Sequence, residues 1–154
     1  MSLFVVGLAV EGLVETVPAG AASNAKLSGS YSYIATDVCQ DPVHIDGQYD
    51  ETVHTYFDQQ GNAIRLAFTG KVTVRYTDLV SGATYRPNSS GPATVDLATG
   101  QTVIRGGNGT LFDANGVLVA TDGRIVLDAL GFPISVIHHS TDVCSQLGTI
   151  ATPI

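Results

Sequence analysis

The sequence is poor in charge, since only 14% of its 154 residues are Asp, Glu, Lys or Arg, against about 25% in typical soluble domains. Long charged helices and coiled coils are therefore excluded. Basic residues are the scarcer kind: seven Lys and Arg stand against fourteen Asp and Glu. The resulting net charge of −7 disfavours binding to nucleic acid or to an anionic lipid surface.

The chain also has no tryptophan and a single methionine, and glutamate is rare. It is rich instead in valine, threonine and glycine, with 17 glycines, and this composition favours strands and turns over helices. Hydrophobic residues make up 44% of the chain, which is enough for a packed core and excludes intrinsic disorder. The length fits one domain.

The first 22 residues differ in character from the rest. They begin with an apolar run and reach the small-residue stretch Ala19-Gly20-Ala21, which fits a signal-peptide cleavage site. Glu11 and Glu15 interrupt the segment, so it is unsuited to crossing a membrane as a helix. We predict that residues 1–22 are a signal-peptide remnant or a short N-terminal element, and that residues 27–150 form a single domain.

Two cysteines close the same tetrapeptide, Thr-Asp-Val-Cys, at residues 36–39 and 141–144. A disulfide between Cys39 and Cys144 would tie the first strand region to the last. The alternative is a pair of buried free thiols in a cytosolic protein. We predict that the disulfide forms. The disulfide and the N-terminal segment together indicate a secreted, extracellular protein.

The clearest structural signal is an alternation of side chains over residues 64–77. One parity holds Ile64, Leu66, Phe68, Gly70, Val72, Val74 and Tyr76, and the other is mostly polar. Such alternation predicts a long antiparallel strand with one buried face. Gly70 is either the point where a curling sheet bends inward or a break between two strands.

Short runs rich in Val, Ile, Thr, Tyr and Leu follow one another along the chain, separated by turn residues. Asn115-Gly116 and Asp122-Gly123 are strong hairpin signals, because both central residues of a type I′ turn need positive φ. The fold predicted is all-β: an antiparallel up-and-down β-barrel of about 8–10 strands, with a β-sandwich as the alternative. The predicted strands are residues 30–35, 43–49, 52–57, 64–77, 93–97, 102–105, 110–112, 117–120, 124–129 and 134–138.

Three side chains are candidates for acid–base chemistry: His138, Tyr56 and Tyr76. By parity with Ile134, His138 would point inward, where an imidazole can orient or protonate a substrate. The alternative is a histidine hydrogen-bonded at a strand end near Asp142. No nucleophile motif is present, so the sequence does not decide between a catalytic and a non-catalytic barrel.

The sequence has no zinc motif such as His-x-His or paired Cys-x-x-Cys, and we predict no metal and no cofactor. An acidic stretch lacks the spacing of an EF-hand loop, and solvated turn carboxylates explain it better than calcium binding. The acidic side chains of this stretch are Asp41, Asp46, Asp50 and Glu51.

Three of the seven cations, Arg65, Lys71 and Arg75, share the polar parity of the long strand. If that face meets solvent, they are solubilising charges that also discourage pairing between sheet edges. If it lines a lumen, they would form a cationic pocket for a carboxylate-bearing ligand.

With its paired Thr-Asp-Val-Cys sequences and the turns at Phe57–Asn62 and Phe112–Gly116, the region from Ser30 to Cys144 resembles uncharacterised exported β-rich proteins of actinobacteria. The resemblance implies export, a terminal disulfide and a compact β-domain. The architecture also resembles lipocalin-type and allene-oxide-cyclase-type β-barrels. The chain lacks the Gly-x-Trp motif of lipocalins, and neither resemblance assigns a functional residue.

These observations predict a secreted barrel whose lumen binds a small apolar or amphipathic molecule. The alternatives are a barrel-type cyclase or isomerase that uses a buried His or Tyr, and a structural or adhesive surface domain that binds through a sheet edge. The predicted partners include neither nucleic acid nor a membrane. The predicted ligand-binding residues are Leu66, Phe68, Val72, Val74, Tyr76 and His138.

Overall fold

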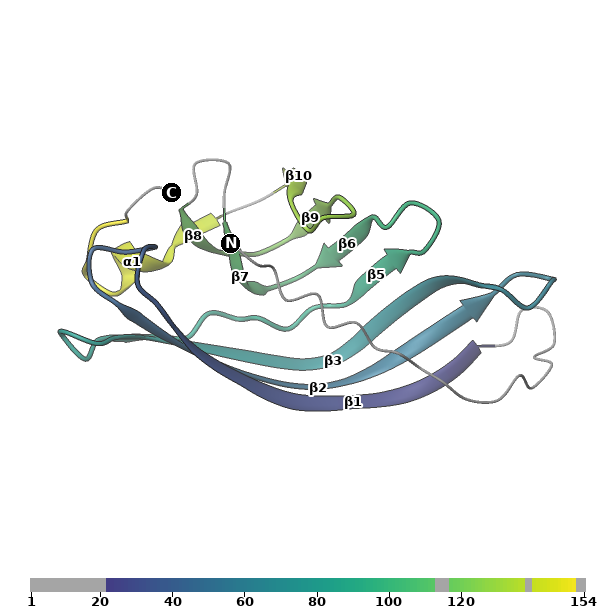
Figure 1. The fold of residues 1–154 in the computed structure, drawn as a ribbon, viewed down its shortest axis with the longest axis horizontal. Helices are drawn as coiled ribbons and strands as arrows, with labels where there is room; N and C mark the ends of the chain where they lie inside the picture. Colours follow the sequence, from purple (N-terminus) through teal and green to yellow (C-terminus); the bar gives the residue numbers. More distant parts are fainter. Residues whose placement is uncertain (1–21, 113–116, 138–139, 152–154) are drawn as a thin grey trace.

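The protein is described from a computed structural model, which covers residues 22–112, 117–137 and 140–151. Within these ranges the chain is built of antiparallel strands with one short helix, which confirms the predicted all-β class (Figure 1). The strands are β1 (Ala22–Ala35), β2 (Val43–Phe57), β3 (Ala63–Asp78), β4 (Thr84–Tyr85), β5 (Ala93–Asp96), β6 (Thr102–Arg105), β7 (Asn108–Phe112), β8 (Leu118–Thr121), β9 (Arg124–Leu127), β10 (Pro133–Ile137) and β11 (Ser140–Asp142), and the helix is α1 (Val143–Gln146).

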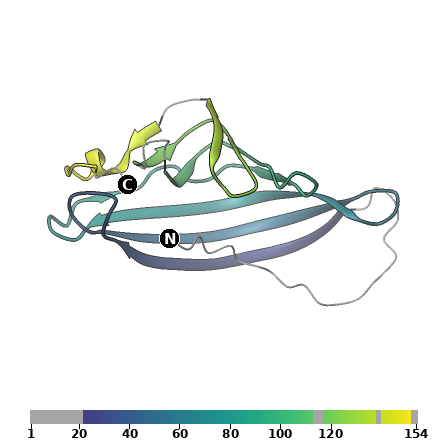
Figure 2. The ribbon, with the colours of Figure 1, turned by 45° about the horizontal axis from the view of Figure 1, so that its top comes forward.

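The strands form two sheets. The larger runs in the order β1-β2-β3-β5-β6-β9-β10, with β4 paired to β3, and the smaller runs in the order β11-β8-β7. The long strands β1, β2 and β3 lie side by side, and the shorter strands rise above them (Figures 1 and 2). Over the described ranges the larger sheet runs from β1 to β10 without closing, so no closed barrel forms there. The choice between barrel and sandwich stays a prediction.

The three long strands are longer than the sequence pattern predicted. β2 continues through residues 50 and 51, where a break was expected, because Asp50 and Glu51 pair with Lys71 and Gly70 of β3. β1 begins at residue 22, although its first residues have low strand propensity, because each of them pairs with β2. Pairing with a neighbour overrides the local preference in both cases.

Gly70 lies within one continuous strand, so of its two predicted roles the break between strands is wrong. Its backbone approaches β2 so closely that a Cβ at this position would collide with the carbonyl group of Asp50. The absence of a side chain is therefore what lets β3 run past β2 at this point.

The predicted hairpin at Asp122-Gly123 is wrong. β8 and β9, the strands on either side of it, belong to different sheets. The dipeptide is instead a corner: Gly123 and Gly106 donate backbone hydrogen bonds to each other's carbonyls at 3.1 and 2.8 Å, where β6–β7 and β8–β9 both pass from one sheet to the other. Gly123 supplies the positive φ, 112°, that the corner needs. Asn115-Gly116 lies outside the described residues.

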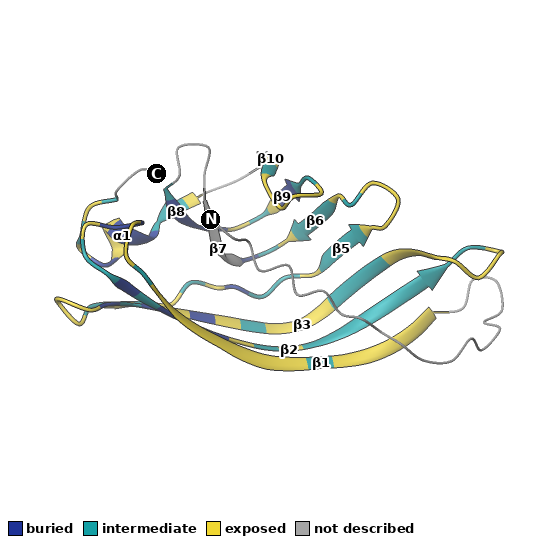
Figure 3. Cartoon of the chain, in the orientation of Figure 1, coloured by how far each residue is buried: buried dark blue, intermediate teal, exposed yellow. Residues whose placement is uncertain are grey.

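The hydrophobic core lies toward one end of the long strands, where β8 and α1 cover β2 and β3 (Figure 3). The predicted disulfide between Cys39 and Cys144 is confirmed, with 5.5 Å between the Cα atoms and both residues at most 2% exposed. The two copies of Thr-Asp-Val-Cys thus bring their Val-Cys pairs into the same core. The buried members of this cluster are Val38, Cys39, Val43, Ile45, Val74, Tyr76, Leu118, Ala120, Val143, Cys144 and Leu147.

Candidate functional site

The two faces of the three-stranded sheet β1–β3 differ sharply in chemistry. The inner face meets the core, whereas the outer face carries hydroxyl, amide, imidazole and charged side chains. We call this second surface the outer polar face. By strand register its polar residues are Asn24, Lys26, Ser28, Ser30, Ser32, His44, Asp46, Gln48, Asp50, Thr52, His54, Tyr56, Arg65, Thr69, Lys71, Thr73, Arg75 and Thr77.

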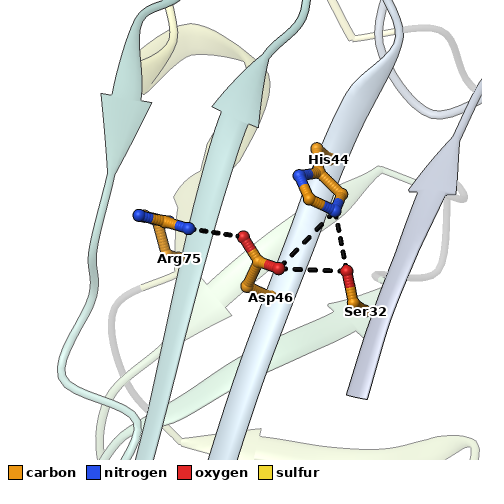
Figure 4. Close-up of polar contacts among 4 residues, drawn as sticks. All are labelled: Ser32, His44, Asp46 and Arg75. Carbon is orange, nitrogen blue, oxygen red and sulfur yellow. Dashed lines mark hydrogen bonds and ion pairs between the residues drawn. The ribbon is translucent and has the colours of Figure 1, made fainter. Parts of the chain in front are cut away.

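Four of these side chains form a connected cluster across all three strands (Figure 4). The Ser32 hydroxyl donates to Asp46 Oδ1 at 3.0 Å and lies 2.7 Å from His44 Nε2. On the other side, Arg75 Nη2 donates to Asp46 Oδ2 at 2.8 Å. Asp46 is therefore held from both neighbouring strands, and its two oxygens have different partners.

The cluster contains Ser, His and Asp, yet it lacks the geometry of a hydrolytic triad. A triad places the carboxylate on one imidazole nitrogen and the serine on the other. Here Ser32 and Asp46 both approach Nε2 of His44, at 2.7 and 3.5 Å. The His44 and Asp46 side chains are also 34% and 28% exposed. The arrangement orients polar groups at a surface and lacks the relay through both imidazole nitrogens by which a triad activates its serine.

Hydrogen bonding from Arg75, and to a smaller extent from Ser32, holds the pKa of Asp46 below its ordinary value. Replacing Arg75 by glutamine should raise the pKa of Asp46, which NMR titration of the side-chain carboxyl would measure. A carboxyl whose pKa is lower in the folded state adds stability above the unfolded pKa, and this is lost as the pH falls through the folded pKa. Below about pH 4, the wild type should therefore lose more stability than Arg75→Gln.

The Arg124→Gln variant is the control for this prediction, because Arg124 lies on β9, away from the cluster. It should leave the pKa of Asp46 unchanged. An equal rise in both variants would mean that the net charge of the chain, and not the hydrogen bond from Arg75, sets the titration of Asp46.

Two adjoining hollows open on the outer polar face, and they share Gln48 and Thr73. The first, of about 340 Å³, lies between β2, β3 and the segment that follows β4; the second, of about 460 Å³, spans β1, β2 and β3. The first is lined by Asp46, Gln48, Thr73, Val74, Arg75, Arg86 and Pro87, and the second by Ser28, Gly29, Ser30, Gln48, Tyr49, Asp50, Lys71 and Thr73.

The outer polar face gathers positive charge in a chain whose net charge is −7. Five of the seven cations lie on it or line its hollows, against two carboxylates of β1–β3, Asp46 and Asp50. Of the five, Arg75 is paired with Asp46, whereas Lys71 and Arg86 have no ion-pair partner among the described residues. The cations are Lys26, Arg65, Lys71, Arg75 and Arg86.

The predicted ligand-binding residues of β3 share the inner face, as their parity indicated. As a group they line neither of the two hollows, which open on the outer polar face. Val74 and Tyr76 are buried in the core, whereas Leu66, Phe68 and Val72 are half-buried. Of the five, only Val74 borders a hollow. His138 lies outside the described residues.

The two candidate catalytic tyrosines do not converge. The ring of Tyr76 is buried and stacks on Tyr85, with 6.3 Å between the ring centres. Tyr56 lies on the opposite face of the sheet, where the guanidinium carbon of Arg65 sits 4.2 Å from the centre of its ring. Tyr76 thus packs in the core and Tyr56 contacts Arg65, while their catalytic roles stay predictions.

Three of the four acidic side chains of this stretch lie on β2 and are divided between its two faces, whereas Asp41 precedes the strand. Asp46 and Asp50 point outward, whereas Glu51 points to the inner face, where partial burial raises its pKa. Within the described ranges no group of three His, Cys, Asp or Glu side chains is placed to hold a metal ion. No helix in this part of the chain is long and apolar enough to cross a membrane.

Three members of the site, Ser32, His44 and Arg86, were missed by the sequence analysis. Serine is common on exposed strands, and only the pairing of Ser32 with Asp46 across β1 and β2 gives it significance. Arg86 reaches the outer polar face because the preceding residues pair with β3. The parity of residues 64–77 identified Arg65, Lys71 and Arg75, whereas strand register was the missing signal for Ser32, His44 and Arg86.

Comparisons with known proteins identify no relative. No family model, no curated protein and no solved structure matches this chain. Only the chemistry of the site itself therefore points to a function.

Proposed function

We propose that this protein is a non-catalytic binding module that works outside the reducing cytosol and holds a carboxylate-bearing, hydroxylated ligand on its outer polar face. The observation that carries the proposal is that three of the seven cations, Lys71, Arg75 and Arg86, line two adjoining hollows on a face that holds five of the seven, in a chain of net charge −7. An acidic chain does not attract anions in general. A local excess of cations therefore favours the binding of a particular anionic ligand at this place.

The free donors on this face suit a carboxylate. Arg75 uses one guanidinium nitrogen on Asp46, and its remaining N–H groups can donate further hydrogen bonds. Lys71 and Arg86 are exposed cations on either side of the shared pair Gln48 and Thr73. Ammonium and guanidinium groups bind carboxylates through charge-assisted hydrogen bonds, which are stronger than neutral ones.

The spacing of the cations favours an elongated ligand. Lys71 and Arg75 lie four residues apart on β3, which corresponds to about 13 Å along a strand. Neutral donors and acceptors lie between and beside them, contributed by Ser28, Ser30 and Gln48. A short acidic oligosaccharide, with carboxylates at intervals and hydroxyls between them, has the matching chemistry.

The location outside the cytosol is supported by the disulfide, since reducing conditions in the cytosol keep thiols free. Secretion through the predicted signal sequence is part of the proposal. The predicted apolar ligand in a closed lumen stays a prediction: Leu66, Phe68 and Val72 lie half-buried on the inner face, and native mass spectrometry would detect a retained apolar molecule.

The test is a calorimetric titration of the protein with trigalacturonate. Neutral maltotriose is the matched ligand control. We expect trigalacturonate alone to bind, and to bind at least about tenfold more weakly to Lys71→Ala/Arg86→Ala, because each lost charge-assisted hydrogen bond is worth about 1.5 kcal/mol or more. Binding should also weaken with added salt.

The matched protein control is Arg105→Ala/Arg124→Ala, which removes the same charge from an exposed pair on β6 and β9. This variant should bind as the wild type does. Equal weakening in the two double variants, or equal binding of maltotriose, would contradict the proposal.

A further inference from the structure

The two edges of the larger sheet are built differently. β10 forms one edge, and it begins with Pro133 and has a register shift within its first residues. Proline and bulges are devices by which natural edge strands avoid pairing with other chains. This edge is therefore protected against the addition of a further strand.

β1 forms the other edge, and it has almost none of these devices. It pairs with β2 over fourteen consecutive residues without a register shift, contains no proline and carries a single charge, Lys26. In the part of the chain that the structure describes, no strand pairs with its second side, and it lies along the margin of the sheet (Figure 2). A regular, exposed edge of this length is a template for another strand.

From this contrast we infer that β1 is an assembly interface, and that its partner is β1 of a second copy of this chain, paired antiparallel about a two-fold axis near the middle of the strand. Pairing of this kind is isologous and closes as a dimer. It joins the two larger sheets into one continuous sheet.

Charge supports a second copy as the occupant. With the axis between Gly29 and Tyr31, Lys26 faces one of residues 32–36 of the other copy, all of which are uncharged. Neither strand brings a carboxylate to the interface, although the chain has fourteen acidic residues. Antiparallel pairing about this axis therefore opposes no like charges within the paired strands.

Each face of β1 is also suited to lie beside the same face of β1 in a second copy. Its outer positions carry Ser28, Ser30 and Ser32, and its inner positions include Tyr33, which is 45% exposed. A two-fold axis perpendicular to the sheet places outer positions beside outer positions and inner beside inner. The serine rows of the two copies would become neighbours on one face and the exposed apolar side chains on the other.

The experiment measures the mass of the full chain in solution by sedimentation equilibrium over a range of concentrations. We expect the wild type to be a dimer. The variants Ser30→Lys and Ser30→Glu should each be monomeric, because each places like charges beside one another near the axis. An equimolar mixture of the two should regain the dimer mass, since lysine then faces glutamate. Circular dichroism checks that each variant retains the β-fold.

Ile134→Lys is the matched control, because Ile134 is an exposed residue on the β10 edge. It should remain a dimer. A monomeric wild type would overturn the inference, and so would a dimer that the Ser30 variants leave intact. A dimer that is lost when residues 1–21 are removed, while β1 stays intact, would also overturn it, because that segment and not β1 would then hold the two copies together.

Discussion

Replacing Cys39 and Cys144 together by alanine is expected to lower the free energy of unfolding by about 4 to 5 kcal/mol. The bond joins residues 105 positions apart, so its loss frees a long loop in the unfolded chain. Alanine leaves no unpaired thiol in the core, where the two cysteines are 2% and 0% exposed. Urea denaturation and the melting temperature, which should fall by roughly 15 °C, would measure the change.

A reducing agent provides the control for this substitution. It should lower the melting temperature of the wild type toward that of the double variant and leave the double variant unchanged. A loss of less than about 1 kcal/mol, far under the expected range, would show that the unfolded chain stays compact at this end without the bond.

Tyr76→Ala is expected to cost about 3 to 5 kcal/mol of unfolding free energy, the usual price of removing a buried aromatic side chain. Tyr76 is 0% exposed and packs against Tyr85 within the hydrophobic core. The substitution therefore leaves a cavity between β3 and the elements that cover it. Urea denaturation of the purified variant would measure the loss.

The matched variant is Tyr56→Ala, which removes the same side chain from the opposite face of the sheet. Tyr56 is only partly buried, and its ring contacts Arg65, a cation–π interaction worth about 1 kcal/mol at an exposed site. Similar losses in the two variants would contradict the assignment of Tyr76 to the core.

Side-chain parity predicted the two faces of β3 correctly. The alternation over residues 64–77 placed Val74 and Tyr76 on the buried face and Lys71 and Arg75 on the other, as the structure has them. Successive side chains of an extended chain point to opposite faces whatever the strand pairs with. The two faces of a strand can therefore be predicted from a single sequence. The duplicated Thr-Asp-Val-Cys sequence similarly predicted the disulfide.

Features that depend on pairing could not be predicted in the same way. Asp122-Gly123 has the chemistry of a hairpin turn, but a corner between two sheets uses the same positive φ, and only the neighbour Gly106 distinguishes the two. The contact of Ser32 with Asp46 depends on the register of β1 against β2, which is set by the connection of residues 36–42. Local sequence signals do not specify such registers.

The position of the disulfide also determines how the protein would respond to mechanical load. Cys39 lies after β1, and Cys144 lies in α1, so every strand from β2 to β11 is inside the covalent loop. Tension applied along the chain from before β1 to beyond α1 would pass through the sulfur atoms and bypass that loop. Among the described residues, only β1 and the segment after Cys144, which pairs with residues 39 and 40, would be pulled from their neighbours, while the strands inside the loop would stay shielded from extension.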